Sequence, residues 1–192
     1  MPGDGFPVLS LLLFLPIAGA VLIAFLPSER VKTHAALDWL PGGEQDRAKW
    51  LALAISLTTF VIALILYIDF DRGQAGFQFT DTFTWISASD VGFDVGYSLG
   101  VDGLSMPLIL LNAFLTTIAI LISWRVDLRP KEYFAFLLIL ETSVFGVFMA
   151  LDLLLFFLFF ELELLPMFML ISIWGSGARR HYSALKFVLY TV

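Results

Sequence analysis

Hydrophobic residues in this chain are gathered into long runs that short polar segments separate. A helix that crosses a bilayer needs about 20 mostly apolar residues, because the hydrocarbon layer is about 30 Å thick and the helix rises 1.5 Å per residue. Runs of this length predict transmembrane helices over residues 7–26, 50–68, 104–124, 133–151 and 153–173. The sequence therefore predicts an all-α, polytopic helix bundle in a membrane.

The fourth and fifth predicted helices share one apolar stretch, residues 133–173. As a single helix this stretch would be about 60 Å long, twice the thickness of the hydrocarbon layer, so the chain must turn within it. Asp152 is the polar residue near its middle, and Asp is a favoured N-cap. We expect a tight turn at Asp152 that leads into a helix starting at Leu153.

A sixth apolar run begins at Ser183 and stops at Val192. Its ten residues would rise about 15 Å, half of the hydrocarbon layer. A chain end at that depth would leave backbone carbonyl groups without hydrogen-bond partners. We therefore expect residues 1–192 to be a single membrane-domain fragment, with further helices after Val192.

Basic residues occupy alternate connections between the predicted helices. The connections after the first, third and fifth helices contain nine Lys or Arg residues, whereas the connection after the second contains one, Arg72. The nine are Arg30, Lys32, Arg47, Lys49, Arg125, Arg129, Lys131, Arg179 and Arg180. Because cytoplasmic loops carry an excess of Lys and Arg, this pattern predicts that the N-terminus lies outside.

The connection over residues 69–103 has a character of its own. Glycines recur along it, and Phe77-Gln78-Phe79 and Phe83-Thr84-Trp85 are short alternating runs of apolar and polar residues. Alternation between turn residues is typical of strands, so we expect a short β-hairpin on the outer surface. An irregular loop is the alternative.

Composition agrees with a membrane protein. Of the 192 residues, 59% are hydrophobic and 15% charged, whereas soluble domains have about 45–50% and about 25%. The net charge of −6 argues against nucleic acid as a partner. Cysteine is absent, and His34 and His181 lie outside the apolar runs, so thiolate metal sites, cysteine-held clusters and a haem lack ligands. We expect no metal and no redox cofactor in this chain.

Four ionisable side chains fall inside the apolar runs, namely Glu141, Glu161, Glu163 and Lys186. Each costs about 2.5–3.5 kcal/mol to insert at the centre of a membrane helix and so is a functional candidate. Glu161 lies eight residues into its helix, about 12 Å deep, and Glu163 points about 200° away from it. Pro166 removes the hydrogen bond to the carbonyl of Leu162, beside Glu161.

Buried carboxylates with a buried Lys are suited to carrying protons, because moving one partner changes the proton occupancy of the other. We expect Glu161 to carry or gate the proton, with Lys186 as a relay and Glu141 and Glu163 as weaker candidates. The alternative is that these groups form static ion pairs that lock helices together.

Several segments, in one order, carry a family resemblance. They are Tyr97-Ser98-Leu99-Gly100-Val101-Asp102-Gly103-Leu104-Ser105, the run 150–157, Phe160-Glu161 with Leu165-Pro166-Met167-Phe168, Trp174-Gly175, and the run 184–191. These segments resemble the antiporter-like subunits of respiratory complex I, of the subunit M or chain 4 type. The specific match covers about residues 97–191, and the first seventy residues match only in hydropathy.

The resemblance implies a subunit of about fourteen helices with two inverted repeats and broken helices. By its spacing to Pro166, Glu161 matches the essential Glu of the fifth helix, which in the family pairs with a Lys on a seventh helix that this chain does not reach. Glu141 matches a Glu that is common in subunit M. Glu163 matches a position that is acidic in plastoquinone-type relatives.

The resemblance also implies a function, a proton-translocating membrane-arm subunit of a complex I-type oxidoreductase. NADH or ferredoxin, FMN, iron–sulfur clusters and quinone would then belong to partner subunits, and this chain would perform no redox chemistry. Its partners would be other membrane-arm subunits, especially antiporter-like neighbours, and the lipid of a bacterial inner (plasma), thylakoid or mitochondrial inner membrane. The alternatives are a subunit of a multisubunit sodium/proton antiporter or membrane-bound hydrogenase, and a non-transporting scaffold.

Overall fold

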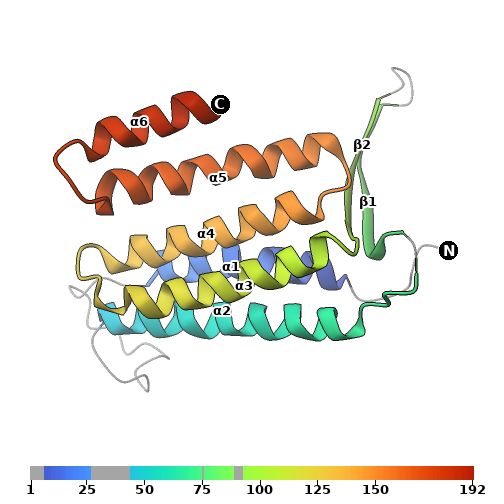
Figure 1. The fold of residues 1–192 in the computed structure, drawn as a ribbon, viewed down its shortest axis with the longest axis horizontal. Coiled ribbons are helices and arrows are strands. Elements are labelled where there is room, and N and C mark those ends of the chain that lie inside the picture. The colour runs from blue at the N-terminus through green and yellow to red at the C-terminus, as the bar shows by residue number, and fades with distance from the viewer. Residues whose placement is uncertain (1–6, 27–43, 75, 89–92) are drawn as a thin grey trace.

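The structure is a computed structural model that describes residues 7–26, 44–74, 76–88 and 93–192, with no account of the side chains of 44–46 and 84–95. It consists of six helices and one hairpin (Figure 1). In chain order the elements are α1 (Val8–Ala24), α2 (Glu44–Asp69), β1 (Gln78–Ala88), β2 (Phe93–Val101), α3 (Ser105–Ile122), a 3₁₀ turn (Ser123–Arg125), α4 (Pro130–Met149), α5 (Leu153–Trp174) and α6 (Arg180–Thr191).

Four segments of the described chain are long and apolar enough to cross a bilayer. They are Arg47–Asp69, Ser105–Arg125, Pro130–Met149 and Leu153–Trp174. Helix α1 is apolar along its whole length but shorter, at 17 residues. The prediction of a polytopic, mostly helical membrane protein is confirmed.

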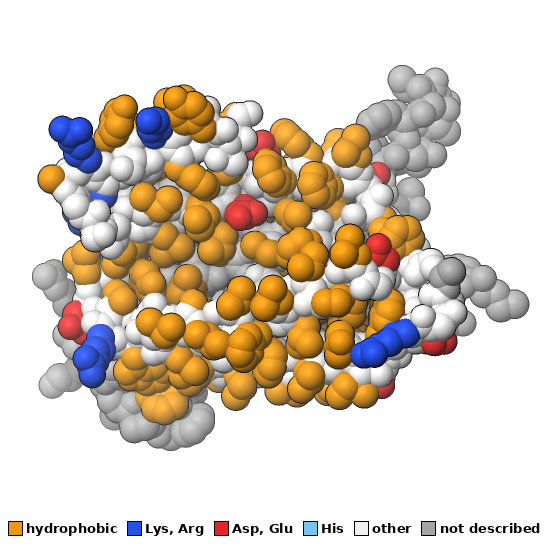
Figure 2. Space-filling view, viewed as in Figure 1, with side chains coloured by type: hydrophobic (Ala, Val, Ile, Leu, Met, Phe, Trp, Pro, Cys, Tyr) orange, Lys and Arg blue, Asp and Glu red, His pale blue; other side chains and the backbone are white. Residues whose placement is uncertain are grey.

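The helices run up and down, so their connections gather at two ends of the bundle (Figure 1). At one end, called here the hairpin end, lie the β-hairpin and the turn at Asp152. The connections α3–α4 and α5–α6 lie at the opposite end, called here the basic end. Arg125, Arg129, Arg179 and Arg180 belong to these connections or border them. Figure 2 shows the flanks of the bundle as a largely apolar surface between the two ends.

The hairpin predicted over residues 69–103 is present. Its strands β1 and β2 pair antiparallel, with Phe83 opposite Tyr97. Two contacts attach the α4–α5 turn to β2: Leu99 forms a bridge with Ala150, and the Leu151 N–H donates to the Ser98 carbonyl at 2.9 Å. The hairpin therefore covers the end of the bundle as a packed element.

A carboxylate of the hairpin holds the first turn of α1. Asp81 accepts hydrogen bonds from both the backbone N–H and the hydroxyl of Ser10, each at 2.9 Å. The hydroxyl of Tyr97 donates to Ser10 Oγ at 3.0 Å. Since the first N–H groups of a helix have no partner within the helix, Asp81 replaces a local N-cap for α1.

The turn into α5 forms as the sequence predicts. Asp152 Oδ1 accepts from the backbone N–H groups of Leu154 and Leu155, at 2.8 and 3.2 Å. The side chain is thus the N-cap of α5, and it satisfies two N–H groups that would otherwise lack partners. This confirms that the long apolar stretch is two antiparallel helices.

Helix α4 is the centre of the bundle, with α1, α3 and α5 packed around it. Gly146 permits a close approach to α5, because a Cβ atom at this position would fall inside the ring of Phe159. Gly19 likewise allows α1 to lie close to α2, because a Cβ atom at this position would meet the side chain of Ile55. Helix α5 has fewer neighbours, and Phe156, Phe157 and Leu158 are among its exposed apolar residues.

Candidate functional site

The structure distributes the four predicted site residues over three helices. Glu141 lies in the middle of α4, Glu161 and Glu163 lie in α5, and Lys186 lies in α6. Their surroundings differ sharply. Glu141 is 1% exposed, the two carboxylates of α5 are half-buried, and Lys186 is exposed.

Glu161 lies in a groove between α5 and α6. The cavity has a volume of about 640 Å³, and its lining includes Leu185, Val188 and Leu189 of α6 and Val192, which follows that helix. Every other lining residue is apolar, so Glu161 is the single charged group of this groove. Pro166 lies inside α5 one turn further on, and it leaves the carbonyl of Leu162 without its helical N–H partner.

Lys186 does not meet Glu161. Helices α5 and α6 run antiparallel (Figure 1), with Glu161 13 residues before the end of α5 and Lys186 six residues after the start of α6, so the two residues are offset by about 10 Å along the helix axes. The ammonium group of Lys186 instead lies 5.6 Å from the centre of the Tyr190 ring. Within the part of the chain that the structure describes, neither residue forms an ion pair.

Glu163 lies outside the groove that Glu161 lines. Two residues along a helix correspond to a rotation of about 200°, so the two carboxylates of α5 point to different sides. Among the described residues Glu163 makes no hydrogen bond and no ion pair. The two groups therefore form no carboxylate pair that could share a proton.

Glu141 has the most enclosed environment of the four. Its Oε1 oxygen accepts a hydrogen bond from Thr59 of α2 at 2.9 Å, and its backbone carbonyl accepts one from the amide of Asn112 of α3 at 3.2 Å. Its Oε2 oxygen is buried without a hydrogen-bond partner among the described residues. Residues of three helices thus meet at Glu141, and Thr59 is the one that bonds to its carboxyl group among the described residues.

Sequence reasoning missed both partners of Glu141. Thr59 is 82 residues away along the chain and Asn112 is 29 residues away, so no local motif joins them. The available signal was weak: polar residues that interrupt apolar runs on neighbouring helices. Thr59 interrupts the second predicted helix and Asn112 the third.

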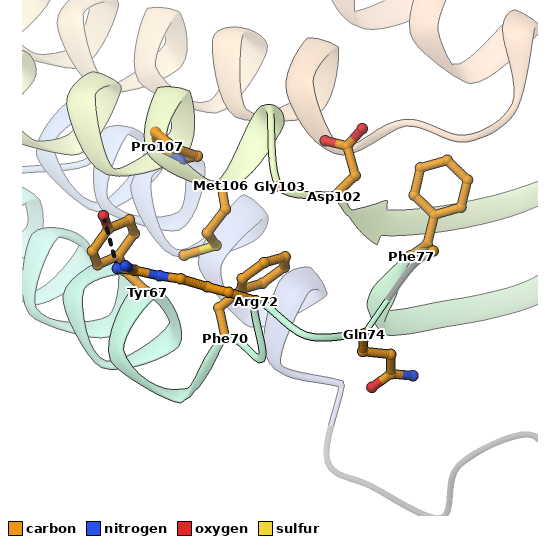
Figure 3. A pocket seen from close by; sticks show the side chains of 10 residues that line it. Tyr67, Phe70, Arg72, Gln74, Phe77, Asp102, Gly103, Met106 and Pro107 are labelled. Carbon is orange, nitrogen blue, oxygen red and sulfur yellow. Dashed lines mark hydrogen bonds between the residues drawn. The ribbon is translucent and has the colours of Figure 1, made fainter.

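A further cavity of about 590 Å³ lies at the hairpin end, between the end of α2 and the start of α3 (Figure 3). Arg72 lines it and donates to the hydroxyl of Tyr67 at 3.3 Å, with its guanidinium 5.6 Å from the centre of the same ring. Asp102 also lines the cavity but hydrogen-bonds to the first turn of α3. Within this cavity the arginine and the carboxylate therefore have separate partners.

No group of three or more His, Cys, Asp or Glu residues within the described chain has the geometry of a metal site. His181 of α6 hydrogen-bonds to the buried Ser172 of α5, with 2.7 Å between Nδ1 and Oγ.

The fold and these carboxyl groups define a class, a polytopic helical membrane protein with ionisable groups inside its spans. The family described as NADH:quinone oxidoreductase/Mrp antiporter, TM, matches residues 150–192. The chain is 41% identical over 187 residues to NAD(P)H-quinone oxidoreductase chain 4 of Prochlorococcus marinus (strain NATL2A), covering 97% of this chain and 31% of that relative.

A second relative is NADH-quinone oxidoreductase subunit M of Rhodobacter capsulatus. It is 42% identical over 185 residues, which cover 96% of this chain and 33% of the relative. The chain thus spans about a third of the length of the curated relatives that it matches. The resemblance to antiporter-like subunits of the M or chain 4 type is confirmed.

A solved structure shows the same fold. The structure of the membrane-bound sulfane sulfur reductase, an archaeal respiratory membrane complex, matches with a TM-score of 0.65 at 19% identity. The match covers 95% of this chain and 25% of that chain. The overall fold of this chain therefore also occurs in that structure.

Proposed function

We propose that this chain belongs to a proton-translocating membrane-arm subunit of a complex I-type NADH (or ferredoxin):quinone oxidoreductase. Its similarity to chain 4 and subunit M over nearly its whole length is the observation that carries the proposal. In such a complex the chain contributes to a translocase and leaves electron transfer to partner subunits, which hold NADH or ferredoxin, FMN, iron–sulfur clusters and quinone. Antiporter-like subunits are its neighbours, and a bacterial plasma or thylakoid membrane is its location.

Glu161 is the proton-carrying group in this proposal. It is the one charged residue of an otherwise apolar groove, and a half-buried carboxylate in such a place binds or releases a proton when a cation approaches or withdraws. Lys186 is too far along α6 for a direct pair, so its role is to relay protons toward Glu161 from the basic end. Glu163 lies outside the groove and has the weakest case.

Glu161→Gln tests this role, because Gln keeps the shape of the side chain but cannot bind a proton. We expect the variant to assemble, to lose proton transport and to slow the coupled quinone reduction, whereas Glu161→Asp retains much of both. Proton uptake by vesicles that contain the reconstituted complex is the measurement, with a native gel to check assembly. Glu163→Gln is the matched control, two residues away on the same helix. Wild-type pumping by an assembled Glu161→Gln variant would make the carboxylate structural and favour a scaffold.

A second candidate function is a subunit of a multisubunit sodium/proton antiporter or a membrane-bound hydrogenase. The matching family includes the Mrp antiporter in its description, which is the observation in favour. The two functions differ in their coupling. Inhibition of quinone reduction in the Glu161→Gln variant supports the oxidoreductase, whereas loss of sodium-driven proton exchange without any effect on electron transfer supports the antiporter.

A further inference from the structure

A layer of polar side chains crosses the middle of the bundle. One apolar cluster at the hairpin end includes Ala63, Ile109 and Phe145, and another at the basic end includes Ala52 and Ile120. The residues between them on α2, α3 and α4 are buried and polar: Ser56, Thr59, Thr117, Glu141, Thr142 and Ser143. Burying polar groups is costly unless they are paired, so this layer is a feature that packing alone does not explain.

Thr59 is the residue of this layer that contacts the carboxyl group. Its hydroxyl lies within hydrogen-bond distance of three acceptors: the carbonyl of Ser56 at 2.8 Å, Glu141 Oε1 at 2.9 Å and the carbonyl of Ile55 at 3.3 Å. A hydroxyl has one hydrogen and two lone pairs. Thr59 can therefore donate fully to Glu141 or to the α2 backbone, but not to both.

The protonation state of Glu141 decides between these two arrangements. When Glu141 is ionised, it can only accept, so Thr59 must turn its hydrogen toward Oε1 and give up the short bond to the Ser56 carbonyl. When Glu141 takes a proton from water onto Oε1, its O–H donates to a lone pair of Thr59, and the Thr59 hydrogen returns to Ser56. Only the proton is gained, and every other covalent bond is unchanged.

The surroundings favour the protonated arrangement. In the ionised form the charge would also rest on Oε2, which is buried and has no donor among the described residues. Helices α1 and α3 contain no ionisable residue, and neither carboxylate of α5 bonds to Glu141. The charged residues described on α2 are Arg47, Lys49 and Asp69, each at least about 15 Å from Thr59 along the axis. On α4 itself, Lys131 and Glu132 lie nine or more residues away.

We infer that Thr59 and Glu141 form a two-state hydrogen-bond switch in which Glu141 holds a proton inside the first four helices, apart from Glu161. Thr59 is a positioning residue. It orients the carboxyl group, and its bond to the carbonyl of Ser56 on α2 forms when Glu141 is protonated and breaks when Glu141 is ionised. Asn112 fixes the backbone of α4 at the same point through its bond to the Glu141 carbonyl. The inference deepens the proposed function, because it adds a second protonatable site to the subunit, but its test does not depend on pumping.

Infrared spectroscopy of the assembled complex in lipid tests the switch. The wild-type spectrum minus that of Glu141→Gln should contain the carbonyl-stretch band of one protonated carboxylic acid. In Thr59→Val, this band should move to higher frequency because the carboxyl group loses its partner, and Thr59→Ser should restore its position. Thr58→Val is the matched control, since the exposed Thr58 hydroxyl donates to the carbonyl of Ala54, at 2.7 Å, and to no other described residue.

The outcomes separate this inference from the proposed function. The band should persist unchanged in Glu161→Gln, whether or not that variant pumps. A difference spectrum without a protonated-acid band would mean that Glu141 is ionised and would overturn the inference. A band that is equal in Thr59→Val and Thr58→Val would remove Thr59 from the switch.

Discussion

Asp102 illustrates how much one polar side chain does at the end of a membrane helix. Its Oδ1 accepts from the backbone N–H groups of Leu104 and Ser105, at 3.1 and 2.7 Å, and the hydroxyl of Ser105 accepts from the N–H of Asp102 at 3.0 Å. This reciprocal pair satisfies three donors where the chain enters α3. The alternating pattern of residues 69–103 predicts a hairpin there but gives no sign of this role for Asp102.

We expect Asp102→Ala to destabilise the protein by about 0.5–2 kcal/mol, the usual effect of losing a side chain that caps the N–H groups at a helix start. Hydrogen bonds from Ser105 hold the pKa of the Asp102 carboxyl below its ordinary value. A lowered folded-state pKa gives stability that is present above the unfolded-state pKa and lost as the pH falls through the folded-state value. We therefore expect the unfolding temperature in detergent to fall less in the variant than in the wild type when the pH is lowered from neutral to below 4.

The control for this experiment is Asp127→Asn, because Asp127 is exposed and makes no hydrogen bond with another described residue. Its unfolding midpoint should match that of the wild type at every pH. If the Asp102→Ala variant and the wild type lose the same stability in acid, protonation of Asp102 does not contribute to that loss.

At the scale of elements, Gly146 allows α4 to pack closely against Phe159 of α5. Any larger residue there places its Cβ atom in the Phe159 ring, so either the ring must leave its present position or the two helices must move apart. We expect Gly146→Ala to destabilise the protein by about 1–3 kcal/mol. Thermal unfolding of the purified protein in detergent is the measurement.

Two further variants test whether the contact between Gly146 and Phe159 causes the loss of stability. Gly103→Ala should be nearly neutral, because a Cβ atom at Gly103 would have no neighbour within 4 Å. Combining Gly146→Ala with Phe159→Leu should recover part of the lost stability, since the smaller side chain leaves room for the added methyl group. If the double variant is as unstable as the sum of the two single changes, the contact between the two residues is not the cause.

Elements were predictable from the sequence to different degrees, for physical reasons. The long helices follow from apolar runs, and the α4–α5 turn follows from one Asp in a stretch too long for one span. The hairpin follows from alternation, but its attachment to α1 through Asp81 and Ser10 joins residues 71 positions apart. The contact between Thr59 and Glu141 likewise depends on which faces of α2 and α4 meet. Such pairings depend on how the helices pack together, and no short stretch of a single sequence indicates which helix faces will meet.

For the candidate carboxylates, the direction of each side chain was predictable from the sequence, but its burial was not. Helical spacing predicts that Glu161 and Glu163 face different ways, and the groove includes one without the other. The degree of burial was not predictable, because it depends on how many neighbours each helix has. Helix α4 lies at the centre and encloses Glu141, whereas α5 lies near the edge and leaves Glu161 half-buried.

The whole molecule has a polarity that sets its expected orientation in the membrane. Arg125, Arg129 and the pair Arg179 and Arg180 lie at or beside the basic end, whereas the described basic residue at the hairpin end is Arg72. Since positive residues are retained in the cytoplasm, the basic end should lie inside and the hairpin end outside. Glu161, eight residues from the start of α5, then lies nearer the outer face, and a proton that reaches it from inside must cross more than half of the bundle.

Single cysteines test this orientation, because residues 1–192 contain none. Gln74→Cys, at the hairpin end, should react with a membrane-impermeant maleimide in intact cells, whereas Ala178→Cys, at the basic end, should react only after the membrane is opened. Both positions are exposed in the structure, so accessibility within the protein is matched and the bilayer makes the difference. Labelling of Ala178→Cys but not Gln74→Cys in intact cells would reverse the orientation, and Glu161 would then lie nearer the cytoplasm than the outer face.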